Sequence, residues 1–176
     1  QKLRRINGRS LSFKQIDEYK FLENPLHSIL CEATRLKDFK DDPVWIKRKL
    51  RLSASIAEIR EVFGRLVALK YIVKNSNNRW KVSHDLASSE NDFTDLAVQS
   101  YHQKVMELAS AQISQQETSQ REYQSFSFGI KKEKIPEAKA MIRRFYHEFF
   151  DAVEGEWGQS DDLYQLNIQL FSLTKD

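Results

Sequence analysis

Residues 41–82 read DDPVWIKRKLRLSASIAEIREVFGRLVALKYIVKNSNNRWKV and decide the fold of this chain. Asp42 followed by Pro43 predicts a helix over about residues 43–50, because the aspartate can cap the first turn and proline lacks only an amide that would be unpaired there. Ser55 and Glu58 have the S-x-x-E spacing of a capping box, which predicts a second helix from about residue 56.

We expect the second helix to bury one face, because its apolar residues recur at steps of four and three. They are Ile59, Phe63, Leu66 and Leu69. The β-branched and aromatic triplets 71–73 and 80–82 flank a polar turn at 75–78, which predicts an antiparallel hairpin. Two short helices followed by a hairpin are the element order of a winged helix-turn-helix.

A further helix is predicted just upstream, where residues 19–37 show apolar side chains at helical spacing. Pro25 interrupts the pattern, so the helix should begin there with Asn24 as its cap. We expect it to pack under the other two and complete a winged-helix module over 19–83. Residues 1–18 are basic and poorly periodic and are predicted to be a tail, or a linker from an upstream region. The small polar stretch 84–91 is predicted to be a linker.

Residues 92–176 predict four elements in the order helix, strand, helix, strand. The first helix covers about 92–116, with an apolar side that includes Tyr101 and Val105. Residues 125–130 alternate between apolar and polar, which predicts a half-buried strand; residues 163–174 alternate in the same way. Between them, residues 132–154 form the clearest amphipathic pattern of the chain. Its apolar stripe consists of Ile135, Ala138, Ile142, Phe145, Phe149 and Val153.

The predicted fold class is therefore α+β: a winged helix-turn-helix followed by an α-β-α-β module (residues 92–176) with a small antiparallel sheet. Two strands alone make a marginal sheet. Either they pair with each other under two helices, or a second copy of the chain extends the sheet.

Composition and charge narrow the class of protein. No stretch of the 176 residues is apolar for long enough to cross a bilayer, so no membrane partner is expected. A single cysteine, Cys31, is expected to be a small buried residue and fits a reducing cytoplasmic compartment. Residues 1–90 hold 19 basic and 11 acidic residues (net +8), whereas residues 91–176 hold 9 and 14 (net −5). This asymmetry suggests two modules with different partners, although ordinary solvated surfaces would also produce it.

No enzyme, metal or cofactor is expected. The four histidines are scattered without metal-ligand spacing, and the five glycines are too sparse for a phosphate-binding loop. Aromatic residues concentrate in the back half, where a hydrophobic core explains them better than a ligand pocket. Any small-molecule effector is unknown.

Double-stranded DNA is one candidate partner, because basic residues gather before the second helix and on the hairpin. The candidate DNA-binding residues are Lys47, Arg48, Lys49, Arg51, Ser53, Ser55, Arg60, Lys74, Arg79 and Lys81. Trp80 is expected to brace the hairpin from inside. The outward face of the second helix suits base reading poorly, because it carries Arg60 among small and acidic residues. These others are Ala57, Glu61, Gly64 and Ala68.

Protein interfaces are the competing use of these surfaces. Gly64 and Ala68 leave a smooth strip that suits another helix. Phe150 and Trp157 lie off the apolar stripe, and a polar ladder on the last strand, joined by Phe171, could form a dimer seam. The ladder consists of Gln165, Asn167 and Gln169. The expected partner is a second copy of the chain or another protein.

The chain resembles a bacterial paralogous family of largely unassigned function whose members are described as transcriptional regulators. The resemblance rests on residues 42–46 (DPVWI), the helix and hairpin over 55–80 and, above all, the ending YQLNIQLFSLTK at 164–175. It implies an additional helix-turn-helix region upstream. We therefore expect the C-terminal part of a bacterial transcriptional regulator, with a winged helix that contributes non-specific phosphate contacts or packing and a back half that dimerises or senses a signal. The alternative is a protein-interaction scaffold that docks through the winged helix and binds no nucleic acid.

Overall fold

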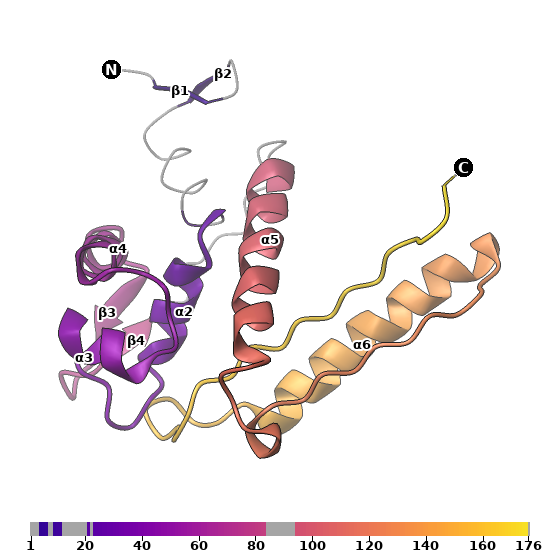
Figure 1. Ribbon diagram of the computed structural model, residues 1–176. Coiled ribbons are helices and arrows are strands. Elements are labelled where there is room, and N and C mark those ends of the chain that lie inside the picture. The colour runs from indigo at the N-terminus through magenta and orange to yellow at the C-terminus, as the bar shows by residue number, and fades with distance from the viewer. Residues whose placement is uncertain (1–3, 7–8, 12–20, 22, 84–93, 176) are drawn as a thin grey trace.

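The computed structural model of the protein describes residues 4–6, 9–11, 21, 23–83 and 94–175 (Figure 1). These residues form a mixed α+β structure with two separate two-stranded antiparallel sheets, β1–β2 and β3–β4. In chain order the elements are β1 (Arg4–Ile6), β2 (Arg9–Leu11), α2 (Pro25–Ala33), α3 (Pro43–Lys49), α4 (Ile56–Ala68), β3 (Ile72–Lys74), β4 (Trp80–Val82), α5 (Thr94–Gln112), two 3₁₀ turns (Thr118–Gln120 and Lys132–Lys134) and α6 (Ile135–Val153). The linker predicted at 84–91 lies outside the described residues.

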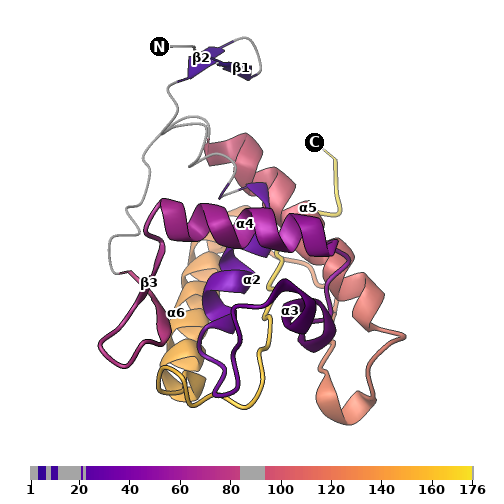
Figure 2. The same ribbon diagram turned by 90° about the vertical axis from the view of Figure 1, so that its left-hand side faces the viewer.

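A helical body forms around α2, α3, α4 and the β3–β4 hairpin, residues 25–82. Helix α4 packs against both α2 and α3, and Figure 2 shows it lying across α2 with the hairpin beyond its C-terminal end. The largest fully buried apolar side chains come from every part of this body. They are Leu30, Leu36, Ile46, Ile59, Leu66 and Ile72.

The predicted helix starts of the body are confirmed. Asn24 and Asp42 each accept a hydrogen bond from the amide two residues later, at 3.0 Å, and a proline follows each of them. Ser55 and Glu58 form the reciprocal capping box, with Glu58 accepting from the Ser55 amide at 2.8 Å and Ser55 Oγ accepting from the Glu58 amide at 3.2 Å. Hydrogen bonding to Ser55, its backbone amide first, lowers the pKa of the Glu58 carboxyl.

The buried face of α4 differs from the prediction at one end. Ile59, Val62 and Leu66 are buried and Phe63 is half-buried, but Leu69 is exposed. Leu69 is the residue after the last helical position, and Lys70 turns to a positive φ of 59°, so the chain has already left the helix where the pattern expected another buried turn. The first hairpin strand is shifted by one residue, to Ile72–Lys74, whereas the second, Trp80–Val82, lies where it was predicted.

The back half departs most from the prediction. Helix α5 packs against α2 and buries Ala97 and Val105. However, α6 has no fully buried residue: in its apolar stripe, predicted to be core, Phe145, Phe149 and Val153 are exposed, and the other three residues are only half-buried. The predicted strands 125–130 and 163–174 belong to no sheet in the described structure, and Figure 1 shows α6 and the C-terminal segment running away from the helical body. The prediction that they form a sheet within one chain is therefore wrong for these residues, because the two segments do not hydrogen bond to each other.

None of the described helices combines the length and the apolar character required to cross a bilayer.

Replacing Ser55 tests the capping box. Ser55→Ala should lower the free energy of unfolding by about 0.5–2 kcal/mol, because the amide of Glu58 loses its acceptor at a helix start. Urea denaturation followed by circular dichroism measures the change. Ser53→Ala, an exposed serine two residues earlier, is the control and should leave the midpoint unchanged; equal losses in both variants would contradict the cap's role.

Cys31 is buried as predicted, at 3% exposure. Burial, with a smaller effect from the Glu32 carboxylate, raises the pKa of the Cys31 thiol to about 12. The reactive thiolate is therefore nearly absent at pH 8 in the folded chain. We expect a disulfide-exchange reagent to label Cys31 only after denaturation, whereas a Ser76→Cys variant, exposed in the turn between β3 and β4, should label at once. Rapid labelling of Cys31 in the native protein would contradict this burial.

Candidate nucleic-acid interface

Some of the predicted DNA-binding residues contact other groups of the same chain, and others are exposed to solvent. At the end of α3, the Lys47 ammonium group donates to the carbonyl of Leu52 at 2.8 Å and so stabilises the segment between α3 and α4. Lys49 pairs with Asp38 at 2.8 Å, and this bond lowers the pKa of the Asp38 carboxyl. Ser55 uses its hydroxyl in the capping box. These three residues therefore have structural partners already.

The hairpin cations are also engaged or partly covered. Arg79 donates to the carbonyl oxygens of Lys37 and Gly158, at 3.0 and 3.1 Å. Lys74 lies over the Trp80 ring, 5.0 Å from its centroid, and Lys81 is half-buried. The hairpin is thus less available for phosphate than its sequence suggests.

Trp80 braces the hairpin as expected. Its ring meets Phe63 of α4 edge-on at 5.4 Å, and its indole N–H donates to Asp41 at 2.9 Å. The hairpin is therefore fixed against both α4 and the loop that precedes α3.

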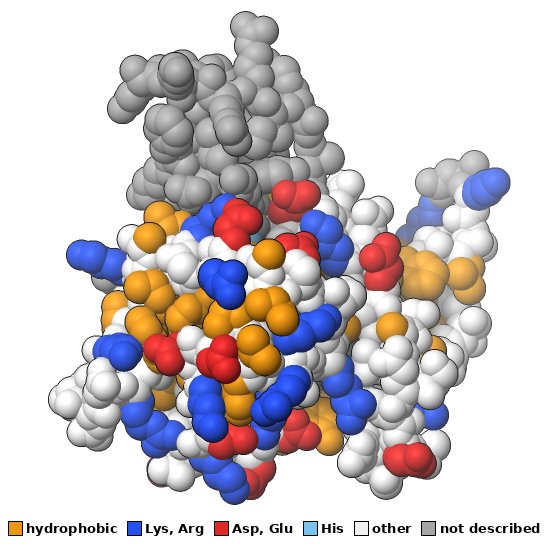
Figure 3. All heavy atoms as spheres, turned by 60° about the vertical axis from the view of Figure 1, so that its left-hand side comes forward, with side chains coloured by type: hydrophobic (Ala, Val, Ile, Leu, Met, Phe, Trp, Pro, Cys, Tyr) orange, Lys and Arg blue, Asp and Glu red, His pale blue; other side chains and the backbone are white. Residues whose placement is uncertain are grey.

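Three arginines remain exposed without an ion pair or hydrogen bond to the described part of the chain: Arg48, Arg51 and Arg60. They belong to the end of α3, the α3–α4 link and the second turn of α4, and the exposed Ser53 lies in the same link. We call Arg48, Arg51 and Arg60 the free arginines. Figure 3 shows Lys and Arg side chains around an apolar patch on this side of the helical body.

The outer face of α4 is open. A Cβ added at Gly64 would meet no atom within 4 Å, and Ala68 is exposed, so no part of the described back half covers this strip. Glu61 pairs with Arg65 at 2.7 Å, which neutralises the acidic residue that would otherwise repel phosphate. Ile56 and Val67 add exposed apolar area to the face.

The site that joins the two halves of the chain was not predicted from the sequence. Arg35, just after α2, donates to Glu32 at 2.6 Å, pairs with Glu154 and lies 4.1 Å above the ring of Trp157. Backbone hydrogen bonds join the same places, from the Lys37 amide to the Ser160 carbonyl and from the Ser160 amide to the Arg35 carbonyl, at 3.0 and 3.2 Å. We call residues 154–163 the docking segment.

Gly158 is the conformational requirement of this docking. Its φ is +76°, a conformation that strains a larger residue, and an added Cβ would lie 3.0 Å from the Arg79 guanidinium carbon and would crowd that side chain. Beside it, the Trp157 indole N–H donates to the Trp80 carbonyl at 3.0 Å. Trp157, predicted as an interface residue, therefore makes its contacts within the chain. Its place off the apolar stripe was the available sequence signal.

The other predicted interface residues do not form one surface. Phe150 and Phe171 are exposed, and Gln165 bonds only to its neighbours Leu166 and Asn167. Asn167 also donates to the Val105 carbonyl of α5 at 3.3 Å. Gln169 is exposed.

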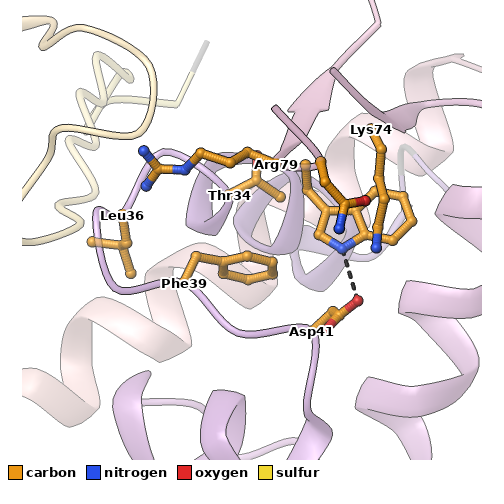
Figure 4. Close-up of a pocket in the computed structure, with 8 residues that line it drawn as sticks. Thr34, Leu36, Phe39, Asp41, Lys74 and Arg79 are labelled. Atoms are coloured by element: carbon orange, nitrogen blue, oxygen red, sulfur yellow. Dashed lines mark hydrogen bonds between the residues drawn. The ribbon is translucent and has the colours of Figure 1, made fainter. Parts of the chain in front are cut away.

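A hollow of about 210 Å³ lies between the hairpin and residues 34–41, and Figure 4 shows Phe39, Asp41 and Arg79 around it. Its charged groups already have partners, since Asp41 accepts from Trp80 and Arg79 donates to two carbonyls. Among the described residues, no three His, Cys, Asp or Glu side chains lie close enough to hold a metal ion.

Replacing Arg35 tests the docking site. Arg35→Gln should release the docking segment, because it removes two charge pairs and the contact with Trp157. A loss of one to two kcal/mol would raise the undocked fraction by about 5- to 30-fold. Cleavage after Glu154 and Glu156 by a glutamate-specific protease, followed by mass spectrometry, should increase accordingly. Arg48→Gln is the matched control, and cleavage at its wild-type rate in both variants would contradict the assignment.

A comparison with protein-family models matches residues 8–173 to a domain of unknown function, DUF4423. The comparisons with curated proteins and with solved structures gave no match. Because the match spans nearly the whole of the 176 residues, the chain belongs to the DUF4423 domain family.

Proposed function

We propose that this chain is the C-terminal part of a dimeric, cytoplasmic bacterial transcriptional regulator whose helical body holds DNA through non-specific phosphate contacts. The observation that carries the proposal is the position of the free arginines beside the open outer face of α4. The resemblance to a family described as transcriptional regulators points in the same direction.

The order of elements supports a winged-helix interpretation of the body. Three helices precede a hairpin, and Trp80 fixes that hairpin against α4. In helix-turn-helix proteins the second helix of the motif enters the major groove, which makes α4 the corresponding element here. Its outer face is free, as groove insertion requires.

The side chains on α4 favour backbone contact over sequence reading. Base edges are read mainly by Arg, Lys, Asn, Gln, Ser and Thr, and the outer face of α4 offers Arg60 alone, beside Gly64 and Ala68. Phosphate contacts by the free arginines would position the body on a duplex without selecting a sequence. Sequence selection would then fall to a part of the regulator outside these residues.

The experiment is fluorescence anisotropy of this chain with a labelled random-sequence duplex at about 50 and 200 mM salt. We expect a dissociation constant of about 10⁻⁴–10⁻⁶ M that weakens as salt rises. The triple variant Arg48→Ala, Arg51→Ala, Arg60→Ala should weaken binding and reduce the slope of log K against log salt by about 2–3, since each phosphate contact contributes about 0.9.

The control removes positive charge elsewhere. The double variant Lys40→Ala, Lys175→Ala takes two exposed cations that lie outside α3, the α3–α4 link and α4, and should retain the wild-type slope. Equal effects per removed charge in this variant and in the triple arginine variant would show a response to net charge only. That result, or an absence of binding at the lower salt, would overturn the phosphate-contact proposal.

The second candidate function is a protein-docking scaffold, and the exposed apolar residues on α4 favour it. Ile56 and Val67 flank the Gly64 strip, which suits the approach of a partner helix. This candidate predicts no duplex binding by the wild-type chain, so the same anisotropy measurement separates the two.

A further inference from the structure

The back half exposes an amount of apolar surface that a folded chain does not leave in water. We call α6 and the two extended segments 121–131 and 163–173 the arm. Phe126 is 83% exposed, Val153 60% and Leu173 74%. Thirteen further large apolar side chains of the arm are exposed: Tyr123, Phe128, Ile130, Met141, Phe145, Tyr146, Phe149, Phe150, Tyr164, Leu166, Ile168, Leu170 and Phe171. Patches of this extent mark interaction sites.

The backbones of the two extended segments lack partners as well. Within the described residues, no amide or carbonyl of residues 122–130 or 163–173 takes part in a backbone–backbone hydrogen bond. Both segments nevertheless alternate apolar and polar side chains, a pattern that is useful only in a sheet with one buried face. The arm therefore has strand-like sequences without a sheet and an amphipathic helix without a core.

The charge along the arm identifies the partner. Within α6, residues 135–144 hold three basic and one acidic residue (net +2), whereas residues 145–153 hold two acidic and no basic ones (net −2). A helix with one basic half and one acidic half is complementary to a second copy of itself that runs in the opposite direction. Such an antiparallel arrangement is the one that a two-fold axis produces.

We propose that the arm completes its fold with the arm of a second copy: α6 packs antiparallel to the α6 of that copy, and the extended segments of both copies form the sheet beneath the helix pair. This inference deepens the dimeric part of the proposed function and is independent of the DNA contacts. The two-fold axis would pass near the middle of α6, where residues 144 and 145 separate the basic half from the acidic half.

The size of the exposed surface fits this occupant. An aromatic side chain can bury roughly 150–250 Å², so the sixteen large apolar side chains at these exposures amount to on the order of 1,000 Å² for each copy. Twice that area reaches the range of obligate homodimers, which begins at about 2,000 Å². The docking segment holds the C-terminal end of α6 to the body, so each helical body would stay at the outer end of its own arm.

Cysteine cross-linking tests the antiparallel arrangement. In a Cys31→Ala background, Ile135→Cys and Val153→Cys place thiols at opposite ends of the apolar stripe. Mild oxidation should give no interchain disulfide in either variant alone, and a cross-linked dimer when the two variants are unfolded and refolded together. Ala140→Cys mixed with Asp151→Cys, on the opposite side of α6, is the matched control and should give none.

The oligomeric state provides an independent readout, by light scattering after gel filtration at micromolar concentration. We expect a dimer in the wild type and a monomer in Phe145→Asp with Phe149→Asp, with the helical body still folded because both side chains are exposed and lie outside its core. Circular dichroism melting monitors that body. Val67→Asp, which adds one charge to the exposed face of α4, should remain dimeric.

A monomeric wild type would overturn the arm pairing and leave the phosphate-contact proposal untouched. An interchain disulfide formed by either single-cysteine variant alone would overturn the antiparallel direction. A dimer that persists in the variant with both Phe145→Asp and Phe149→Asp would overturn the use of α6. Loss of DNA binding by the triple arginine variant with an unchanged dimer would show that the two surfaces act separately.

Discussion

The position of Arg35 between Glu32, Glu154 and the Trp157 ring is the constraint on which the arrangement of the two halves depends. Its side chain is mostly buried, at 18% exposure, so its charge needs these partners. Around it, two backbone hydrogen bonds to Ser160 and the Arg79 bond to Gly158 fix the direction in which the chain leaves the body. These few polar contacts orient the back half of the chain, including α6, relative to the helical body.

This docking changes the role of the hairpin. In a DNA-binding winged helix the basic residues of a hairpin would be expected to meet phosphate, but here Arg79 and the Trp80 carbonyl hold the docking segment. The cations that remain available belong to the α3–α4 region. One side of the helical body thus binds the back half of its own chain. The other side, around α4, is exposed and accessible to a partner.

The arm shows what happens when amphipathic segments are separated from a core. Helix α6 has a well-formed apolar stripe and yet fully buries none of its residues, because the body has already closed its own core with α2, α3, α4 and the hairpin. Within the described residues, the back half adds to the buried surface through Leu163, which packs against that core, and through Ala97 and Val105 of α5. The charge pattern of α6 is complementary to an antiparallel α6 from another copy of the chain, which is the partner we propose.

The sequence by itself determined the local features. The caps at Asn24, Asp42 and Ser55 and the hairpin could be predicted because each depends on residues within a few positions of one another. The amphipathic character of α6 was also predictable, since periodicity is local. Tertiary structure alone decided which basic residues are free, because Lys47, Lys49 and Arg79 find their partners through folding. It also decided that the stripe of α6 is not fully buried within one chain. A pattern of side chains specifies that a face should be buried, whereas the contacts around Arg35, up to 125 residues apart in sequence, determine where that face lies.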